Sequence, residues 1–219
     1  MNVYCLVEGR VTEKQVYASW IPLVNPALTI VRLVQDVVKD NVFIVSGEGM
    51  PQLYSRIAAS VKDMGDFPVF DRFVISLDSE DMDAEAKLNE LMVHVQAAGP
   101  TVPVHPIVQH YCFESWALGH RKIAKKPSTL PRLSNFKKHY EVEVRDPSEM
   151  PSIDPTRYNR AEFSQLYLRL VLNNQHKNLT YSKSNPSAVC HSKFFQQVRA
   201  RVADTGHIGS FQQFLSAFS

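Results

Sequence analysis

Five carboxylates in the first half of the chain have the residue types and spacing that suit a hard divalent ion. Glu8 and Glu13 stand five residues apart, and Asp78, Glu80 and Asp81 form a tight cluster further on. Carboxylates held close together cannot all stay ionised unless a cation neutralises them. An all-oxygen ligand set favours Mg²⁺ or Mn²⁺ over softer metals. The residues therefore predict a magnesium or manganese site.

Both groups of acids follow segments that are expected to be buried strands. The apolar run 2–7 ends at Glu8, and the apolar run 73–77 ends at Asp78. In open α/β sheets the chemistry gathers beyond the carboxyl ends of the strands, so the acids converge if these two strands are neighbours. An alternative is that residues 78–83 form only an acidic helix N-terminus, which complements the helix dipole. The strand-ending Glu8, which has no capping role, favours the metal site.

The remaining elements must position these acids. Strands are also expected over 42–45 and 102–108, the latter near a sheet edge because of Pro103 and Pro106, while 28–38 stays ambiguous between strand and helix. A helix is expected to begin at Thr12 with a capping box and to end at Pro22 and Pro26. Further helices are expected over 51–64, 82–97, 113–122, 161–173, 192–203 and 208–217, with 127–157 irregular. Alternating strands and helices predict an α/β fold with a mostly parallel sheet and helices on both faces.

Charge is segregated along the 219-residue chain. Residues 1–119 carry 8 Lys and Arg against 15 Asp and Glu, whereas residues 120–219 carry 16 against 7. The expected organisation is an α/β domain over 1–120 and a basic, mainly helical region over 121–219 packed on it. A polyanion is attracted to the second half and repelled by the first, except at an acidic site filled with metal. A plain solvated surface is the alternative explanation of the charge pattern.

The two acidic motifs resemble those of the TOPRIM domain, a Rossmann-like fold with a metal site. The segments Val7-Glu8-Gly9-Arg10-Val11-Thr12-Glu13 and Leu77-Asp78-Ser79-Glu80-Asp81 are similar to its strand-end Glu-Gly and Asp-x-Asp motifs. The Glu-Gly-x-x-Thr-Glu form and the segment Phe113-Glu114-Ser115-Trp116-Ala117-Leu118 are most similar to small stand-alone RloB-type and OLD-like TOPRIM proteins. The resemblance covers residues 3–120, and only 181–186 match loosely beyond it.

The resemblance implies a Mg²⁺- or Mn²⁺-dependent nuclease that hydrolyses phosphodiesters in DNA or RNA. Asp78 and either Glu80 or Asp81 would hold metal, with Glu13 as a further ligand. Glu8 would bind metal or act as general base on the attacking water. Asp83 competes with Glu80 and Asp81 for the second acid of the Asp-x-Asp motif.

Two further residues receive roles from the same resemblance. Glu114 would be a supporting acid or a ligand of a second metal, and Lys183 would steady the phosphate or the leaving group. An exposed lysine without a catalytic role is the alternative for Lys183.

The resemblance also implies a bacterial anti-phage defence system as the setting, and the scattered cysteines suit the cytoplasm. Gly47-Glu48-Gly49 lacks a P-loop lysine, so any ATP hydrolysis must come from a partner ATPase. Three scattered cysteines give no disulfide framework or zinc site, and no apolar run reaches the roughly 18 residues of a membrane span. The alternatives left open are a non-hydrolytic interaction or sensor module and an RNA-specific nuclease, for instance one acting on tRNA.

Overall fold

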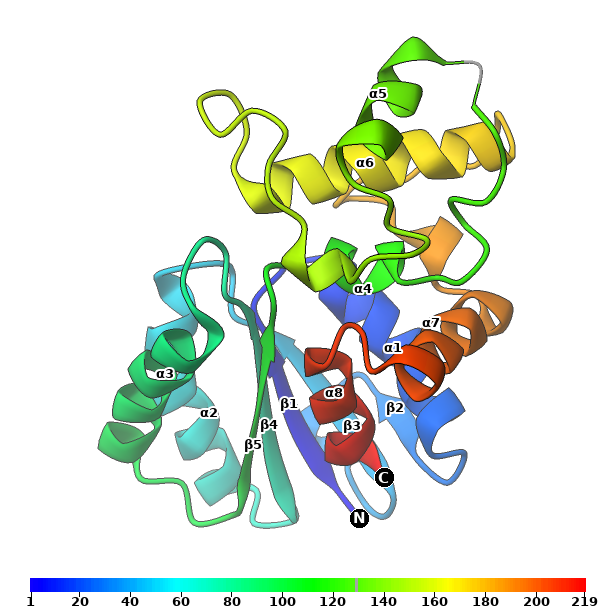
Figure 1. Ribbon diagram of the computed structural model, residues 1–219. Coiled ribbons are helices and arrows are strands. Elements are labelled where there is room, and N and C mark those ends of the chain that lie inside the picture. Colours follow the sequence, from blue (N-terminus) through cyan, green and yellow to red (C-terminus); the bar gives the residue numbers. More distant parts are fainter. Residues whose placement is uncertain (129) are drawn as a thin grey trace. The chain divides into compact units, whose positions relative to one another are not determined.

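The computed structural model describes residues 1–128 and 130–219. Thr129, inside the stretch 127–157 expected to be irregular, lies outside the described residues. The strands are β1 (Val3–Val7), β2 (Thr29–Val31), β3 (Asn41–Ser46), β4 (Arg72–Asp78) and β5 (Val104–Gln109). They form one five-stranded parallel sheet in the order β2-β3-β1-β4-β5 (Figure 1). The prediction of an α/β fold with a parallel sheet is confirmed, and β5 stands at an edge as its prolines predicted.

The helices include eight α-helices and three short 3₁₀ turns within the described residues. Their bounds are α1 (Thr12–Val24), η1 (Val34–Asp36), α2 (Gln52–Asp66), α3 (Ala84–Ala98), α4 (Phe113–Leu118), α5 (Pro131–His139), η2 (Pro147–Glu149), α6 (Arg160–Gln175), η3 (Ser187–Val189), α7 (Ser192–Thr205) and α8 (Ser210–Phe218). Within residues 1–128 and 130–219, none of these helices combines the length and the hydropathy that a bilayer span requires.

Three local predictions are wrong. Thr12 is the first residue of α1 and Val11 occupies the N-cap without a side-chain hydrogen bond, so the expected capping box is not formed. Pro22 does not end α1 but stands inside its last turn, where its missing N–H removes only the hydrogen bond to the carbonyl four residues earlier. The stretch 127–157 is not wholly irregular, because α5 begins at Pro131, and proline is favourable in the first turn of a helix.

The chain divides into two compact units, which are described separately. The first unit comprises residues 1–77, 83–108 and 213–219, and the second unit comprises 78–82 and 109–212. The first unit contains most of the sheet, with α2 and α3 on one face and α1 on the other (Figure 1). The second unit contains α4 to α7 and the first residues of α8, whereas the rest of α8 belongs to the first unit.

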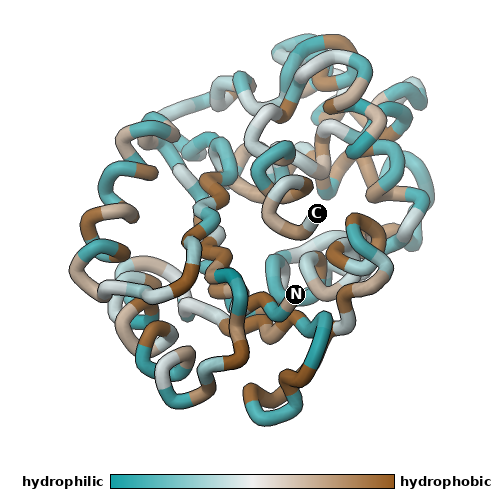
Figure 2. Tube along the Cα trace, turned by 90° about the horizontal axis from the view of Figure 1, so that it is seen from below, coloured by the Kyte–Doolittle hydropathy of each residue, from teal (hydrophilic) through white to brown (hydrophobic). Residues whose placement is uncertain are grey.

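The core of the first unit follows the two-residue period of its strands. Tyr4 and Leu6 of β1 and Phe73, Ile75 and Leu77 of β4 face α2 and α3 in one buried cluster. These two helices alternate between apolar and polar residues along their traces, as the brown and teal bands in Figure 2 show. Each helix therefore presents one apolar face to the sheet and a polar face to solvent.

The opposite face of the sheet is covered by aromatic side chains. Tyr17 and Trp20 of α1 are fully buried and contact the ring of Phe214, and Tyr17 also lies against Phe218. The Tyr17 hydroxyl and the Ser76 Oγ of β4 are 2.7 Å apart in a buried hydrogen bond. This bond fixes α1, which carries Glu13, against the strand that leads to Asp78.

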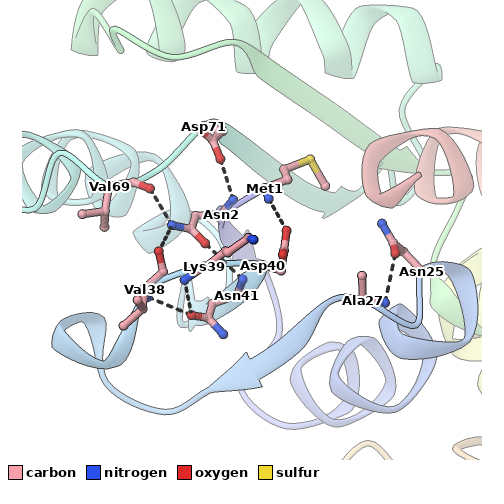
Figure 3. A network of polar contacts seen from close by, with 10 residues as sticks. All are labelled: Met1, Asn2, Asn25, Ala27, Val38, Lys39, Asp40, Asn41, Val69 and Asp71. Carbon is pink, nitrogen blue, oxygen red and sulfur yellow. Dashed lines mark hydrogen bonds and ion pairs between the residues drawn. The ribbon is translucent and has the colours of Figure 1, made fainter.

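A buried asparagine ties together the amino ends of the strands in the first unit (Figure 3). The Asn2 Nδ2 donates to the carbonyl oxygens of Val38 at 3.0 Å and Val69 at 2.8 Å. Its Oδ1 accepts from the Asn41 N–H at 3.1 Å, and its own N–H donates to Asp71 at 2.7 Å. This network lies at the amino ends of β1, β3 and β4, opposite the edge where the acids were predicted.

The second unit is held by aromatic contacts and one buried cation. Phe136 of α5 packs against Phe163 and Tyr167 of α6 with ring centroids 4.9 Å and 5.6 Å away. The Arg201 guanidinium of α7 is buried and donates to the carbonyl oxygens of Val142, Glu143 and Arg145 and to the His207 Nδ1. A single side chain thus satisfies three carbonyls of the loop after α5.

Candidate metal centre

The first unit holds Glu8 directly after β1. The Glu8 N–H donates to the Ser76 carbonyl of β4 at 2.9 Å, and the Glu8 carbonyl accepts from the Gly49 N–H at 2.9 Å. Val7 of β1 pairs with Ser46 of β3 and with Ser76 of β4 in parallel register. The predicted neighbours are therefore adjacent in the sheet, and Glu8 is fixed by backbone hydrogen bonds on both sides.

Gly9 leaves the space that Glu13 occupies. A Cβ at position 9 would overlap the Glu13 carboxylate, which shows that this carboxylate folds back over the Gly9 backbone. Glu13 is buried because it lies on the same face of α1 as the buried Val16, Tyr17 and Trp20. The Glu-Gly motif therefore allows a second carboxylate to approach the chain just beyond Glu8, which explains why glycine is suited to this position.

The acidic group of the second unit begins with Asp78, which is the last residue of β4. The Ser79 N–H donates to the Gln109 carbonyl and the Glu80 N–H to the Tyr111 carbonyl, both at 2.9 Å. Glu80 has a positive φ of 51°, a left-handed conformation that non-glycine residues seldom adopt. The turn after β4 is thus pinned to the end of β5, with Asp78 buried and Glu80 exposed.

Asp78 and Glu114 lie near the same buried thiol. The pKa of Cys112 is raised well above its usual value, first by burial and then by the charges of Glu114 and Asp78. Glu114 is 1% exposed, and its Oε1 accepts a hydrogen bond from the Tyr181 hydroxyl at 2.8 Å. Asp78 and Glu114 are the oxygen donors of this neighbourhood, and oxygen donors suit a hard ion.

Asp83 has a different task from the other acids of this segment. Its side chain accepts hydrogen bonds from the backbone N–H groups of Glu85 at 2.9 Å and Ala86 at 3.1 Å, as the N-cap of α3. The N-cap role accounts for Asp83 without a metal, so Glu80 and Asp81 are the better candidates for the second position of the Asp-x-Asp motif.

Asp81 is exposed and lies in a group that the sequence did not predict. Burial raises the pKa of Tyr111; the Arg160 charge opposes this shift, while the charges of Glu149 and Asp81 add to it. The Arg160 guanidinium stands 4.2 Å from the centre of the Tyr111 ring. A cation at the start of a helix opposes the helix dipole, so the ring and the acids account for the position of Arg160 at the start of α6. Nothing in the local sequence distinguishes Arg160 from other surface arginines.

Lys183 lies in the tight turn between Ser182 and Asn185, which pair with each other as an isolated antiparallel bridge. Its side chain is exposed. The turn is close in sequence to Tyr181, whose hydroxyl contacts Glu114, so Lys183 belongs to the same unit as Asp78 and Glu114.

The structure thus holds two pairs of predicted acids, one in each unit. Glu8 and Glu13 flank Gly9 in the first unit, and Asp78 and Glu114 lie near Cys112 in the second. Carboxylate oxygens are suitable ligands for Mg²⁺ or Mn²⁺. Counting only residues 1–128 and 130–219, no group of three or more His, Cys, Asp or Glu side chains is arranged to hold an ion.

Comparison of the chain with protein-family models, curated proteins and solved structures finds no match.

Proposed function

We propose that the chain is a nuclease that hydrolyses nucleic-acid phosphodiesters with the help of Mg²⁺ or Mn²⁺. The observation that carries the proposal is the parallel pairing of β1 and β4, in which Val7 lies opposite Ser76. Glu8 directly follows Val7, and Asp78 is two residues beyond Ser76, so each strand has an acid at its carboxyl end. Neighbouring strand ends are where open α/β sheets bring catalytic residues together. The sequence resemblance to TOPRIM proteins supports the same assignment.

In this proposal Asp78 and either Glu80 or Asp81 would hold the ion, and Glu13 would be a further ligand. A bound divalent ion would neutralise phosphate charge and lower the pKa of a coordinated water. Glu8, whose backbone is held by hydrogen bonds on both sides, would bind the ion or accept the proton of the attacking water. Glu114 would be a supporting acid beside Asp78 or a ligand of a second ion. Arg160 and Lys183 supply positive charge toward the phosphate.

The nucleic acid is the partner that the basic half suits. Residues 120–219 carry a net charge of +9, and contacts with phosphates supply affinity without reading sequence. The proposal places the nuclease in a bacterial anti-phage system, with a partner ATPase supplying any ATP hydrolysis.

A second candidate function is a non-hydrolytic interaction module. It is favoured by the complete burial of Glu114 under the Tyr181 hydroxyl, which is how a structural carboxylate is held. In that case the acids stabilise the fold and bind no ion.

The test is cleavage of single-stranded DNA, double-stranded DNA, RNA and tRNA with Mg²⁺, with Mn²⁺ and with EDTA. We expect metal-dependent cleavage that Glu8→Gln and Asp78→Asn each reduce by about 10²–10⁴-fold, while circular dichroism spectra and the free energy of unfolding stay close to those of the wild type. The matched control is Glu85→Gln, an exposed acid outside the predicted ligand set. Full activity in a correctly folded double variant contradicts the proposal, and absence of any metal-dependent activity favours the interaction module.

A further inference from the structure

A pocket of about 570 Å³ lies entirely within the second unit. It is formed by the segment after α4, the C-terminal part of α6, the loop that follows α6 and the beginning of α7. Its walls include the apolar side chains of Ile123, Leu172 and Leu179. The volume falls in the range of roughly 300–1,000 Å³ that is typical of small-molecule sites.

The mouth of this pocket is positively charged. Lys122 and Lys193 line it and both are exposed. None of the residues that the structure places around the pocket is a carboxylate. Two cations in a described lining that contains no carboxylate, beside apolar walls, suit a ligand that combines an anionic group with an apolar body.

Two rings form part of the wall. The centroids of His120 and Phe194 are 4.6 Å apart, with the ring planes at 53°. Burial lowers the pKa of His120 to about 4, so the imidazole is neutral at pH 7. Its Nδ1 accepts the Lys122 backbone N–H at 3.1 Å, which places the single proton on Nε2. The lining of the pocket thus includes a half-buried neutral imidazole, which has one ring N–H donor.

We propose that this pocket binds a nucleotide unit, with the base against the half-buried His120 ring, behind which the buried Phe194 ring packs, and the phosphate toward Lys122 and Lys193. A base needs a flat aromatic surface and a few polar groups at its edge, and its phosphate needs cations nearby. His120, His191, Ser192 and Gln175 supply polar groups in the same lining. A fatty acid would instead favour a wall without such groups.

This inference goes beyond the proposed hydrolysis, because the pocket contains none of the predicted metal ligands. The nucleotide unit can be a free mononucleotide or one residue of a nucleic-acid strand, and both present the same base and phosphate. Binding is therefore measured without metal, which separates it from the metal-dependent reaction.

The experiment is titration calorimetry of the full chain in EDTA with each of the four ribonucleoside 5′-monophosphates. The corresponding nucleosides, inorganic phosphate and a 5′-phosphorylated RNA tetramer are the comparison ligands. We expect at least one monophosphate to bind at least ten-fold more tightly than its nucleoside and than phosphate. An equal affinity for the tetramer identifies a free nucleotide as the occupant, and a tetramer that binds ten-fold more tightly identifies a strand.

Two variants of the pocket test its location. The double variant Lys122→Glu/Lys193→Glu is expected to weaken binding at least ten-fold, and Ala188→Trp is expected to do the same by filling the space. The matched control is Lys125→Glu/Lys177→Glu, which makes the same charge change at exposed lysines outside the lining. The inference is overturned if no monophosphate binds at millimolar concentration, if phosphate binds as tightly as the nucleotides, or if the control variant weakens binding equally.

Discussion

The two units use different means to satisfy buried backbone polar groups. In the first unit the parallel ladder of β1, β3 and β4 pairs most of them, and the neutral amide of Asn2 joins the loops at the amino ends of the strands. In the second unit the described chain after α5 is not part of a strand ladder. There the Arg201 guanidinium donates hydrogen bonds to three backbone carbonyls. The difference teaches that the stability of the second unit depends on individual side chains to a greater extent.

The largest stability effect is expected from Arg201→Met in the second unit. The variant keeps the apolar stem but leaves the carbonyls of Val142, Glu143 and Arg145 without their donor, which costs about 3 kcal/mol in the free energy of unfolding. Urea denaturation measures the loss. Arg199→Met, an exposed arginine on the same helix, should change the free energy by less than about 0.5 kcal/mol. A similar small change for Arg201→Met would show that this unit does not depend on the guanidinium.

A smaller effect concerns the response of the second unit to acid. The pKa of His120 falls from 6.5 in the unfolded chain to about 4 in the folded chain, because burial disfavours the charged ring. Below pH 6.5 the unfolded chain binds the extra proton, so this contribution to stability is complete above pH 6.5 and is lost as the pH falls toward 4.

The variant His120→Gln tests this coupling. Between pH 7 and pH 4.5 it should lose about 1–2 kcal/mol less stability than the wild type, a value reduced to allow for the partial exposure of the ring. Urea denaturation at the two pH values provides the measurement. His176→Gln, at an exposed histidine, should keep the acid sensitivity of the wild type. An unchanged sensitivity in His120→Gln would assign the effect to other groups.

The smallest expected effect on stability distinguishes the capping acid Asp83 from the predicted metal ligands. Asp83→Ala removes the N-cap of α3 and should lower the free energy of unfolding by about 1 kcal/mol, without changing metal-dependent cleavage. Glu85→Ala, in the first turn but outside the cap, should cost less. A loss of cleavage in Asp83→Ala beyond that caused by its stability would return Asp83 to the ligand set.

The fold was predictable where the pattern was local and strong. The apolar runs at 2–7, 42–45 and 73–77 are long enough to specify buried strands, and all three lie in the sheet. The helix at Pro131 was missed because proline and charge dominate its surroundings, although proline fits the first helical turn. The edge strand β2 lies in the stretch 28–38 that was ambiguous between strand and helix. It has only three residues, which are too few to show the two-residue period of a strand.

The candidate site was only partly predictable. The pairing of β1 with β4 follows from the rules of α/β sheets once Glu8 and Asp78 are recognised as strand ends. The neighbourhood of Cys112, Asp78 and Glu114 and the position of Arg160 over Tyr111 depend on contacts between distant segments, which carry no local pattern. The capping role of Asp83 was hidden because a cap and a ligand use the same residue type.

The most direct test of the central claim is calorimetric titration of the full chain with Mn²⁺. The account predicts saturable binding in the wild type, a loss of at least ten-fold in affinity for Glu8→Gln and for Asp78→Asn, and no change for Asp83→Asn. Binding that is unaffected by Glu8→Gln and Asp78→Asn, or no binding at millimolar Mn²⁺, would contradict it.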